Sequence, residues 1–167
     1  SALAHSNAVL ALLRDGFVEQ SPGGSVRLAD DGSPILDYDL SDYVWEGVRR
    51  AYLSMAELQF TAGAQKVRSA HIDARYATNW SDAKKAIAEL PLKKFRATLF
   101  TAHLMGGCAM SQNPKRGVVD SAGRHHQMAN LSVMDGSVFP TSIGANPQLS
   151  IYGLVAQNAT ALAKDLR

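Results

Sequence analysis

Hydrophobic residues recur at helical spacing in two long stretches of the chain. The first stretch begins after Ser41 or Asp42, either of which can cap a helix, and ends before Gly63. The second begins near Pro147 and runs towards the C-terminus. The apolar positions that predict these two helices are Val44, Val48, Ala51, Met55 and Leu58 in the first, and Leu149, Tyr152, Val155 or Ala156, Ala159, Leu162 and Leu166 in the second.

Alternating apolar and polar residues predict a β-hairpin, with strands at 25–29 and 35–38 joined by the turn residues 30–33. Other patterns are shorter. They predict a weak helix over 1–14, a loop over 65–80, a helix capped by Ser81 and ended by Pro91, and strands at 95–100, 118–119 and 131–134.

These elements predict two incomplete layers. A hairpin followed by a helix is typical of half an α+β layer, and a strand, turn and helix at the end are typical of the closing part of an α/β domain. The fold class is therefore predicted as α/β, in the form of an α+β fragment.

Composition narrows the class of protein without identifying it. Hydrophobic residues make up 46% of the chain and charged residues 19%, both ordinary for a globular protein. A net charge of +2 with scattered basic residues argues against nucleic acid as a partner. No apolar run reaches the roughly 18 residues of a membrane span. Cys108 is the only cysteine, which fits a reducing compartment and slightly favours the cytoplasm.

Two segments carry candidate chemistry. In the first, His103 precedes the pair Gly106-Gly107, which lets the backbone pass close to a bulky group. In the second, Asp135-Gly136 is followed by a loop rich in Ser, Thr and Gly, and then by Asn146 as a helix N-cap with Pro147 at the first helical position. The N–H groups of such a helix form an anion site. A structural histidine and an ordinary capped surface helix remain the alternatives.

Taken together, the motifs resemble the glucose–methanol–choline oxidoreductase family. They are His103-x-x-Gly-Gly-Cys-x-Met, Gly117-Val-Val-Asp120, Asn130-Leu-Ser-Val-Met-Asp-Gly-Ser-Val-Phe-Pro140 and Gly144-Ala-Asn-Pro-Gln148. Their order and spacing match over about residues 98–167, and the last motif looks most like the cholesterol-oxidase-like branch. Residues 24–64 are similar to the family's substrate domain in a less specific way.

The resemblance implies an enzyme that uses FAD to oxidise an alcohol to an aldehyde or ketone. Residues 1–97 would belong to the substrate-binding domain of a two-domain fold, and residues 98–167 would form the segment that contacts FAD. His103 matches the histidine over the flavin, and Asn146 matches the second catalytic position. The positions that match the cofactor contacts are Asp135, Gly136, Asn146, Pro147 and Gln148.

One feature of the family is missing from this sequence. The dinucleotide fingerprint G-x-G-x-x-G does not occur. The chain therefore needs an N-terminal FAD-binding portion as its partner, and by itself it should be inactive. The alternative is a non-catalytic binding or assembly domain that keeps a remnant of the fold. No spacing of Cys and His residues predicts a metal site.

Overall fold

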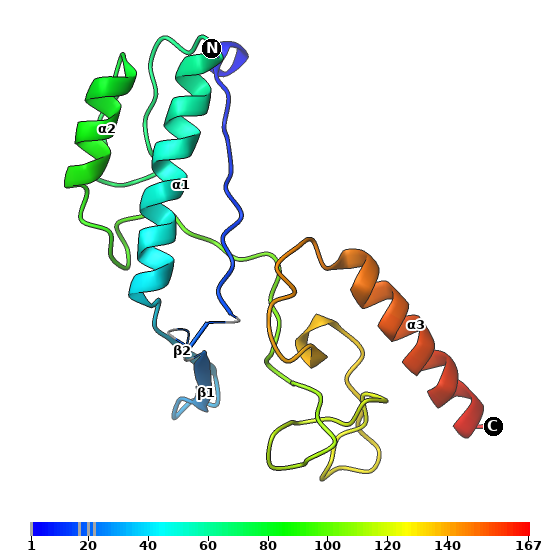
Figure 1. Ribbon diagram of the computed structural model, residues 1–167. Helices are drawn as coiled ribbons and strands as arrows, with labels where there is room; N and C mark the ends of the chain where they lie inside the picture. Colours follow the sequence, from blue (N-terminus) through cyan, green and yellow to red (C-terminus); the bar gives the residue numbers. More distant parts are fainter. Residues whose placement is uncertain (1, 17, 20, 22) are drawn as a thin grey trace. The chain divides into compact units, whose positions relative to one another are not determined.

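The computed structural model describes residues 2–16, 18–19, 21 and 23–167. It is a small mixed fold with one two-stranded sheet, and Figure 1 shows its helices and strands. In chain order these are the short 3-10 helix η1 (Ala2–His5), strands β1 (Gly24–Leu28) and β2 (Pro34–Tyr38), helices α1 (Asp42–Thr61) and α2 (Trp80–Glu89), the 3-10 helix η2 (Gly136–Val138) and helix α3 (Gln148–Asp165).

The chain divides into two units, Ser1–Leu99 and Phe100–Arg167. The sequence placed a boundary between residues 97 and 98. The assignment of the first part to a substrate-binding domain and of the second to an FAD-contacting segment stays a prediction. No helix in the part of the chain that the structure describes is long and apolar enough to cross a membrane.

Helix α1 begins and ends as the sequence predicts. Ser41 is its N-cap and accepts a hydrogen bond from the Val44 N–H, while Gly63 follows its end with a φ of +92°. Its buried face is rotated from the predicted one, because Tyr52 and Ala56 are buried and Leu58 is 59% exposed. The Tyr52 hydroxyl donates to the Ala70 carbonyl, so contacts with the following loop select this face.

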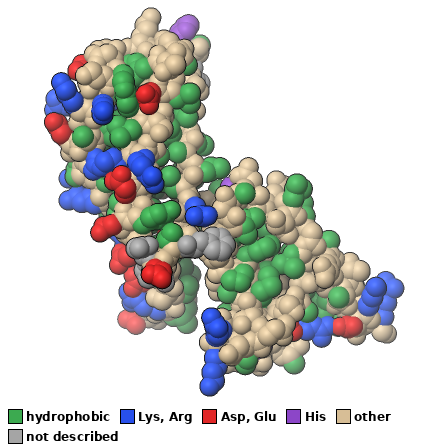
Figure 2. Space-filling view, in the orientation of Figure 1, with side chains coloured by type: hydrophobic (Ala, Val, Ile, Leu, Met, Phe, Trp, Pro, Cys, Tyr) green, Lys and Arg blue, Asp and Glu red, His purple; other side chains and the backbone are tan. Residues whose placement is uncertain are grey.

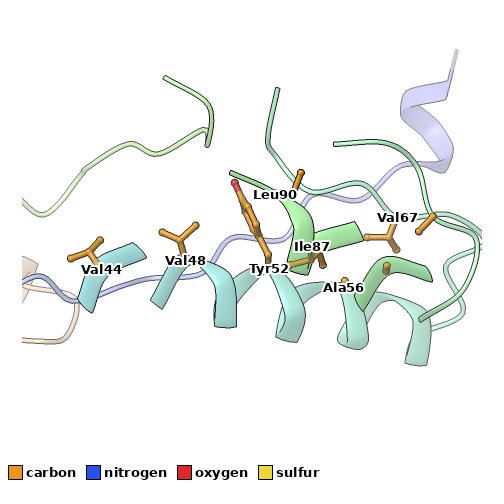
Figure 3. Packing of buried hydrophobic residues seen from close by; sticks show 9 residues of the cluster. Val44, Val48, Tyr52, Ala56, Val67, Ile87 and Leu90 are labelled. Atoms are coloured by element: carbon orange, nitrogen blue, oxygen red, sulfur yellow. The ribbon is translucent and has the colours of Figure 1, made fainter. Parts of the chain in front are cut away.

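The core of the first unit lies between α1, α2 and the loop that connects them (Figure 3). Arg49 strengthens the packing of the two helices, because its guanidinium donates to the Ile87, Ala88 and Leu90 carbonyls at the C-terminal end of α2. A cation at that end also matches the helix dipole. The buried core residues are Val44, Val48, Tyr52, Ala56, Val67, Ala77, Ala83, Ile87 and Leu90.

Helix α2 starts slightly earlier than predicted. Asn79, rather than Ser81, is its N-cap, because the Asn79 Oδ1 accepts a hydrogen bond from the Asp82 N–H at 2.9 Å. The Asn79 amide donates in turn to the Asp82 carboxylate at 2.8 Å. The helix ends at Glu89, shortly before Pro91, as expected of a proline that cannot continue it.

The predicted hairpin is confirmed. Strands β1 and β2 pair antiparallel, with Val26 opposite Leu36 and Gly24 opposite Tyr38. Since alternate residues of paired strands share a face, Val26, Leu28 and Leu36 lie on one face together with Tyr38. All four side chains are exposed.

The other strand predictions are wrong, as is most of the N-terminal helix. Residues 95–100, 118–119 and 131–134 make only isolated bridges, at Ala97, Val119 and Ser132. A β-strand needs a continuous neighbouring strand for its N–H and C=O groups, and here each segment pairs with a different short piece of loop. Within residues 2–16 only η1 is helical.

Candidate functional site

The turn after His103 pairs with η2 through backbone hydrogen bonds. The Cys108 N–H donates to the Ser137 carbonyl at 3.0 Å, and the Met110 N–H donates to the Val138 carbonyl at 2.8 Å. Gly106 reaches this arrangement with a φ of +88°, which L side chains disfavour. The two candidate segments identified in the sequence are therefore neighbours in the second unit.

Gly136 is the point where three motif segments meet. A Cβ atom at Gly136 would lie 2.9 Å from the Ile151 Cδ1 in α3 and 3.4 Å from the Leu104 carbonyl oxygen. Leu104 directly follows His103, and Ile151 lies one helical turn beyond Pro147. The absence of a side chain at Gly136 thus lets the histidine segment, η2 and the first turns of α3 approach one another.

Asp135 holds the start of η2. Its Oδ1 accepts hydrogen bonds from the Ser137 N–H at 2.8 Å and from the Ser137 hydroxyl at 2.5 Å. These hydrogen bonds favour the charged form and hold the pKa of the Asp135 carboxyl below its usual value of 3.8. The carboxylate is exposed and fixed by its own turn, so it can accept a further hydrogen bond from a ligand.

His103 and Asn146 are both exposed. Neither side chain has a hydrogen bond to another of the residues that the structure describes. Asn146 was predicted to be the N-cap of the last helix, and this is wrong. Pro147 occupies the N-cap position instead of the first helical position, and no side-chain hydrogen bond caps the helix. The Pro147 ring carries no cap acceptor, and its carbonyl accepts the first helical hydrogen bond from the Ile151 N–H.

The first turn of α3 is therefore open to a ligand. Its N–H groups, at residues 148–150, form no backbone hydrogen bond within the described part of the chain and receive no side-chain cap. Such groups, together with the helix dipole, favour an anionic or carbonyl oxygen. The Gln148 amide donates to the Tyr152 hydroxyl at 2.7 Å and so lies back along the helix.

A second group of contacts supports this site and was not identified from the sequence. The buried Asn158 of α3 donates to the Ser121 carbonyl at 3.3 Å. The Asp120 Oδ1 accepts from the Ala122 and Arg124 N–H groups, which closes the turn that Asn158 contacts. Asp120 belonged to a recognised motif, whereas nothing in the sequence marked Asn158, a polar residue in an apolar helix, as a packing contact.

Two further histidines, His125 and His126, belong to the same group of supporting contacts. The ring Nε2 of His126 lies 2.9 Å from the Ser111 carbonyl, and the His125 Nδ1 accepts from two backbone N–H groups. Within the part of the chain that the structure describes, no group of three or more His, Cys, Asp or Glu residues could hold a metal ion.

Comparison with known proteins gives a consistent set of matches. The profile of a family described as GMC oxidoreductase matches residues 20–154. The uncharacterized GMC-type oxidoreductase y4nJ of Sinorhizobium fredii is 31% identical over 147 residues, which cover 87% of this chain and 29% of that protein. The long-chain-alcohol oxidase FAO4A of Arabidopsis thaliana is 27% identical over 153 residues, covering 87% of this chain and 20% of that oxidase.

A cholesterol oxidase of Acinetobacter baumannii is 51% identical over a shorter stretch of 55 residues, or 33% of this chain and 10% of that oxidase. The chain thus spans less than a third of the length of each of these three relatives.

Proposed function

Because the chain belongs to the glucose–methanol–choline (GMC) oxidoreductase family, we propose that it is the C-terminal part of a two-domain, FAD-dependent enzyme that oxidises an alcohol to an aldehyde or ketone. The observation that supports this most directly is the meeting of the three motif segments at Gly136. The names of two relatives, a long-chain-alcohol oxidase and a cholesterol oxidase, point to the same class of substrate.

His103 is the proposed acid–base group. Oxidation of an alcohol removes a proton from the hydroxyl and a hydride from the same carbon. FAD, when bound, supplies the hydride acceptor. Imidazole is the side chain that exchanges protons near neutral pH, and the exposed ring of His103 has no protein partner among the described residues that would block it from accepting the hydroxyl proton.

Asn146 is the proposed partner of His103. Its side chain is exposed and does not cap α3, so the amide is free to donate a hydrogen bond to the substrate oxygen. A donor at that oxygen holds the alcohol in one orientation while His103 takes the proton. The motif position of Asn146 and its uncommitted amide support this role.

The remaining residues would hold FAD. The open N–H groups that follow Pro147, beginning at Gln148, would face the part of the flavin that gains negative charge, which a helix N-terminus stabilises by about 0.3–2 kcal/mol. At η2, Gly136 gives a close backbone approach and the Asp135 carboxylate can accept hydrogen bonds from the hydroxyls of the ribityl chain. The adenosine and pyrophosphate would be bound by an N-terminal portion that carries the missing fingerprint.

The test is flavin reduction in the complete enzyme. His103→Ala should slow flavin reduction by alcohol by about 10²–10⁴-fold, the usual contribution of a positioned acid–base group, with flavin content unchanged. Stopped-flow absorbance measures the rate. His5→Ala, which removes an exposed histidine from the first unit, is the matched control and should reduce at the wild-type rate. A His103→Ala enzyme that reduces flavin at the wild-type rate would make His103 a structural residue, whereas a complete protein that neither binds flavin nor oxidises alcohol would favour a binding or assembly domain.

A further inference from the structure

The turn at residues 93–96, in the first unit, holds an aromatic side chain out in solvent. The Arg96 N–H donates to the Lys93 carbonyl at 3.1 Å, which closes the turn, and Phe95 lies within it with a φ of +65°. Glycine is the usual residue in this left-handed conformation, which L side chains disfavour. Among the residues that the structure describes, Phe95 is the only non-glycine with a positive φ, and it is 95% exposed. A large apolar side chain is thus presented to solvent at a position that the backbone disfavours.

Contacts with neighbouring segments fix this turn. The Ile72 N–H donates to the Arg96 carbonyl at 2.9 Å, and the Arg96 Nη1 donates to both oxygens of the Asp73 carboxylate at 2.6 and 2.8 Å. Lys94 pairs with Asp39. Ile72 is itself 65% exposed, so it adds a second exposed apolar side chain beside the turn.

The segment that contains the turn carries the positive charge of the chain. Residues 65–97 hold eight Lys and Arg residues against three Asp and Glu residues, a net charge of +5, whereas the rest of the chain has nine against twelve, a net charge of −3. The cations lie in α2 and in the loops before and after it, and Figure 2 shows Lys and Arg side chains over that part of the first unit. This part of the surface therefore favours an anionic partner.

The cations themselves indicate that this surface stays at the exterior of the complete enzyme. Lys84, Lys85 and Lys93 are exposed, and none of them has an ion pair within the described part of the chain. Burying an unpaired ammonium group costs free energy, and lysine is depleted at the centres of protein interfaces. An outside partner can therefore reach the turn and the cations near it.

We propose that the turn at residues 93–96, with the cations of residues 65–97, docks the enzyme on the surface of an anionic lipid membrane. The cations attract negatively charged headgroups, while Phe95 and Ile72 enter the boundary between the headgroups and the acyl chains. A nucleic acid would match the cations alone, since its phosphates give an aliphatic side chain such as Ile72 no apolar environment. The docking goes beyond the proposed oxidation and does not depend on the role of His103.

Sedimentation of the complete enzyme with lipid vesicles tests the docking. Vesicles of equal parts phosphatidylserine and phosphatidylcholine are compared with vesicles of phosphatidylcholine alone. The wild-type enzyme should bind the anionic vesicles at least about tenfold more tightly, and added salt should remove the difference because it screens charges at the surface.

Two variants locate the binding surface. Phe95→Gly removes the ring and suits the positive φ, so the turn should be kept while the affinity for anionic vesicles falls by about tenfold. Lys93→Glu reverses an unpaired charge in the same turn and should also lower the affinity by about tenfold. Lys115→Glu is the matched control, because it reverses an exposed lysine in the second unit, and it should bind as the wild type does.

Equal affinity of the wild-type enzyme for the two kinds of vesicle would overturn the proposal. Wild-type binding by both Phe95→Gly and Lys93→Glu would overturn it too, as would an equal loss in Lys115→Glu, since net charge rather than this surface would then explain the binding. Tighter binding of a DNA duplex than of anionic vesicles, weakened by the same two variants, would make a nucleic acid the partner. Because the readout is binding, a fully active His103→Ala enzyme would remove the catalytic assignment and leave the docking in place.

Discussion

At the scale of single residues, the candidate site depends on the close approach of its backbone segments as much as on the side chains of His103 and Asn146. His103 and Asn146 are exposed and their side chains make no hydrogen bond within the described chain, so no protein hydrogen bond fixes either side chain. What brings their segments together is the close contact of Gly136 with Ile151 and with the Leu104 carbonyl. Motif matching proposes His103 and Asn146 from the sequence, but the glycine contact depends on the folded arrangement.

A pair of glycine substitutions tests this contact. Gly136→Ala should destabilise the second unit by about 1–3 kcal/mol, the usual cost of overpacking, because the new Cβ would lie 2.9 Å from the Ile151 Cδ1. Gly153→Ala, in the middle of α3 with open space around it, should instead stabilise by about 0.5–1 kcal/mol through helix propensity. Urea unfolding of the 167-residue chain measures both. An unchanged Gly136→Ala protein would contradict the packing described for Gly136.

At the scale of elements, local signals were sufficient for helix α1, for the hairpin and for the approximate positions of α2 and α3. Ser41, Gly63 and the turn residues 30–33 act within a few residues of the chain, so their effects can be predicted from sequence. Local patterns wrongly predicted strands at 95–100, 118–119 and 131–134. A strand depends on a neighbouring strand that the local pattern does not specify. The buried face of α1 differs from the predicted one for a similar reason, because tertiary contacts determine which of two adjacent apolar rows of the helix is buried.

The capping of α2 and α3 gives a matched prediction. Asn79→Ala should lower the free energy of unfolding by about 0.5–2 kcal/mol, because Asn79 caps α2. Asn146→Ala should change the free energy of unfolding by less than about 0.5 kcal/mol, because no side chain caps α3. Urea unfolding of this chain measures the difference. In the complete enzyme, Asn146→Ala should nevertheless slow flavin reduction through loss of the amide donor. Equal losses of unfolding free energy in the two variants would show that Asn146 caps α3 after all. An unchanged rate of flavin reduction in Asn146→Ala would contradict the proposed contact of Asn146 with the substrate.

At the scale of the whole molecule, both units expose apolar surfaces on regular elements. In the first unit the hairpin exposes Val26 and Leu36, which lie opposite each other, and a two-stranded hairpin is only marginally stable without a layer to cover it. In the second unit α3 exposes Leu149 and Tyr152. The chain also spans less than a third of each of the three relatives described. Exposed apolar faces on both units are expected of a chain that forms part of a larger protein.

The proposed division of flavin binding between this chain and an N-terminal portion predicts how the chain behaves when it is purified alone. The purified 167-residue chain should be colourless, and added FAD should give no stoichiometric complex and no alcohol oxidation. The open turn of α3 and the η2 turn offer only a few hydrogen bonds, and the phosphates would lack the glycine-rich cradle that supplies their main contacts. Visible absorbance after gel filtration measures bound flavin, and the complete enzyme prepared in the same way is the positive control. One flavin retained per 167-residue chain would show that these residues alone form the cofactor site, and the proposed division of the enzyme would be wrong.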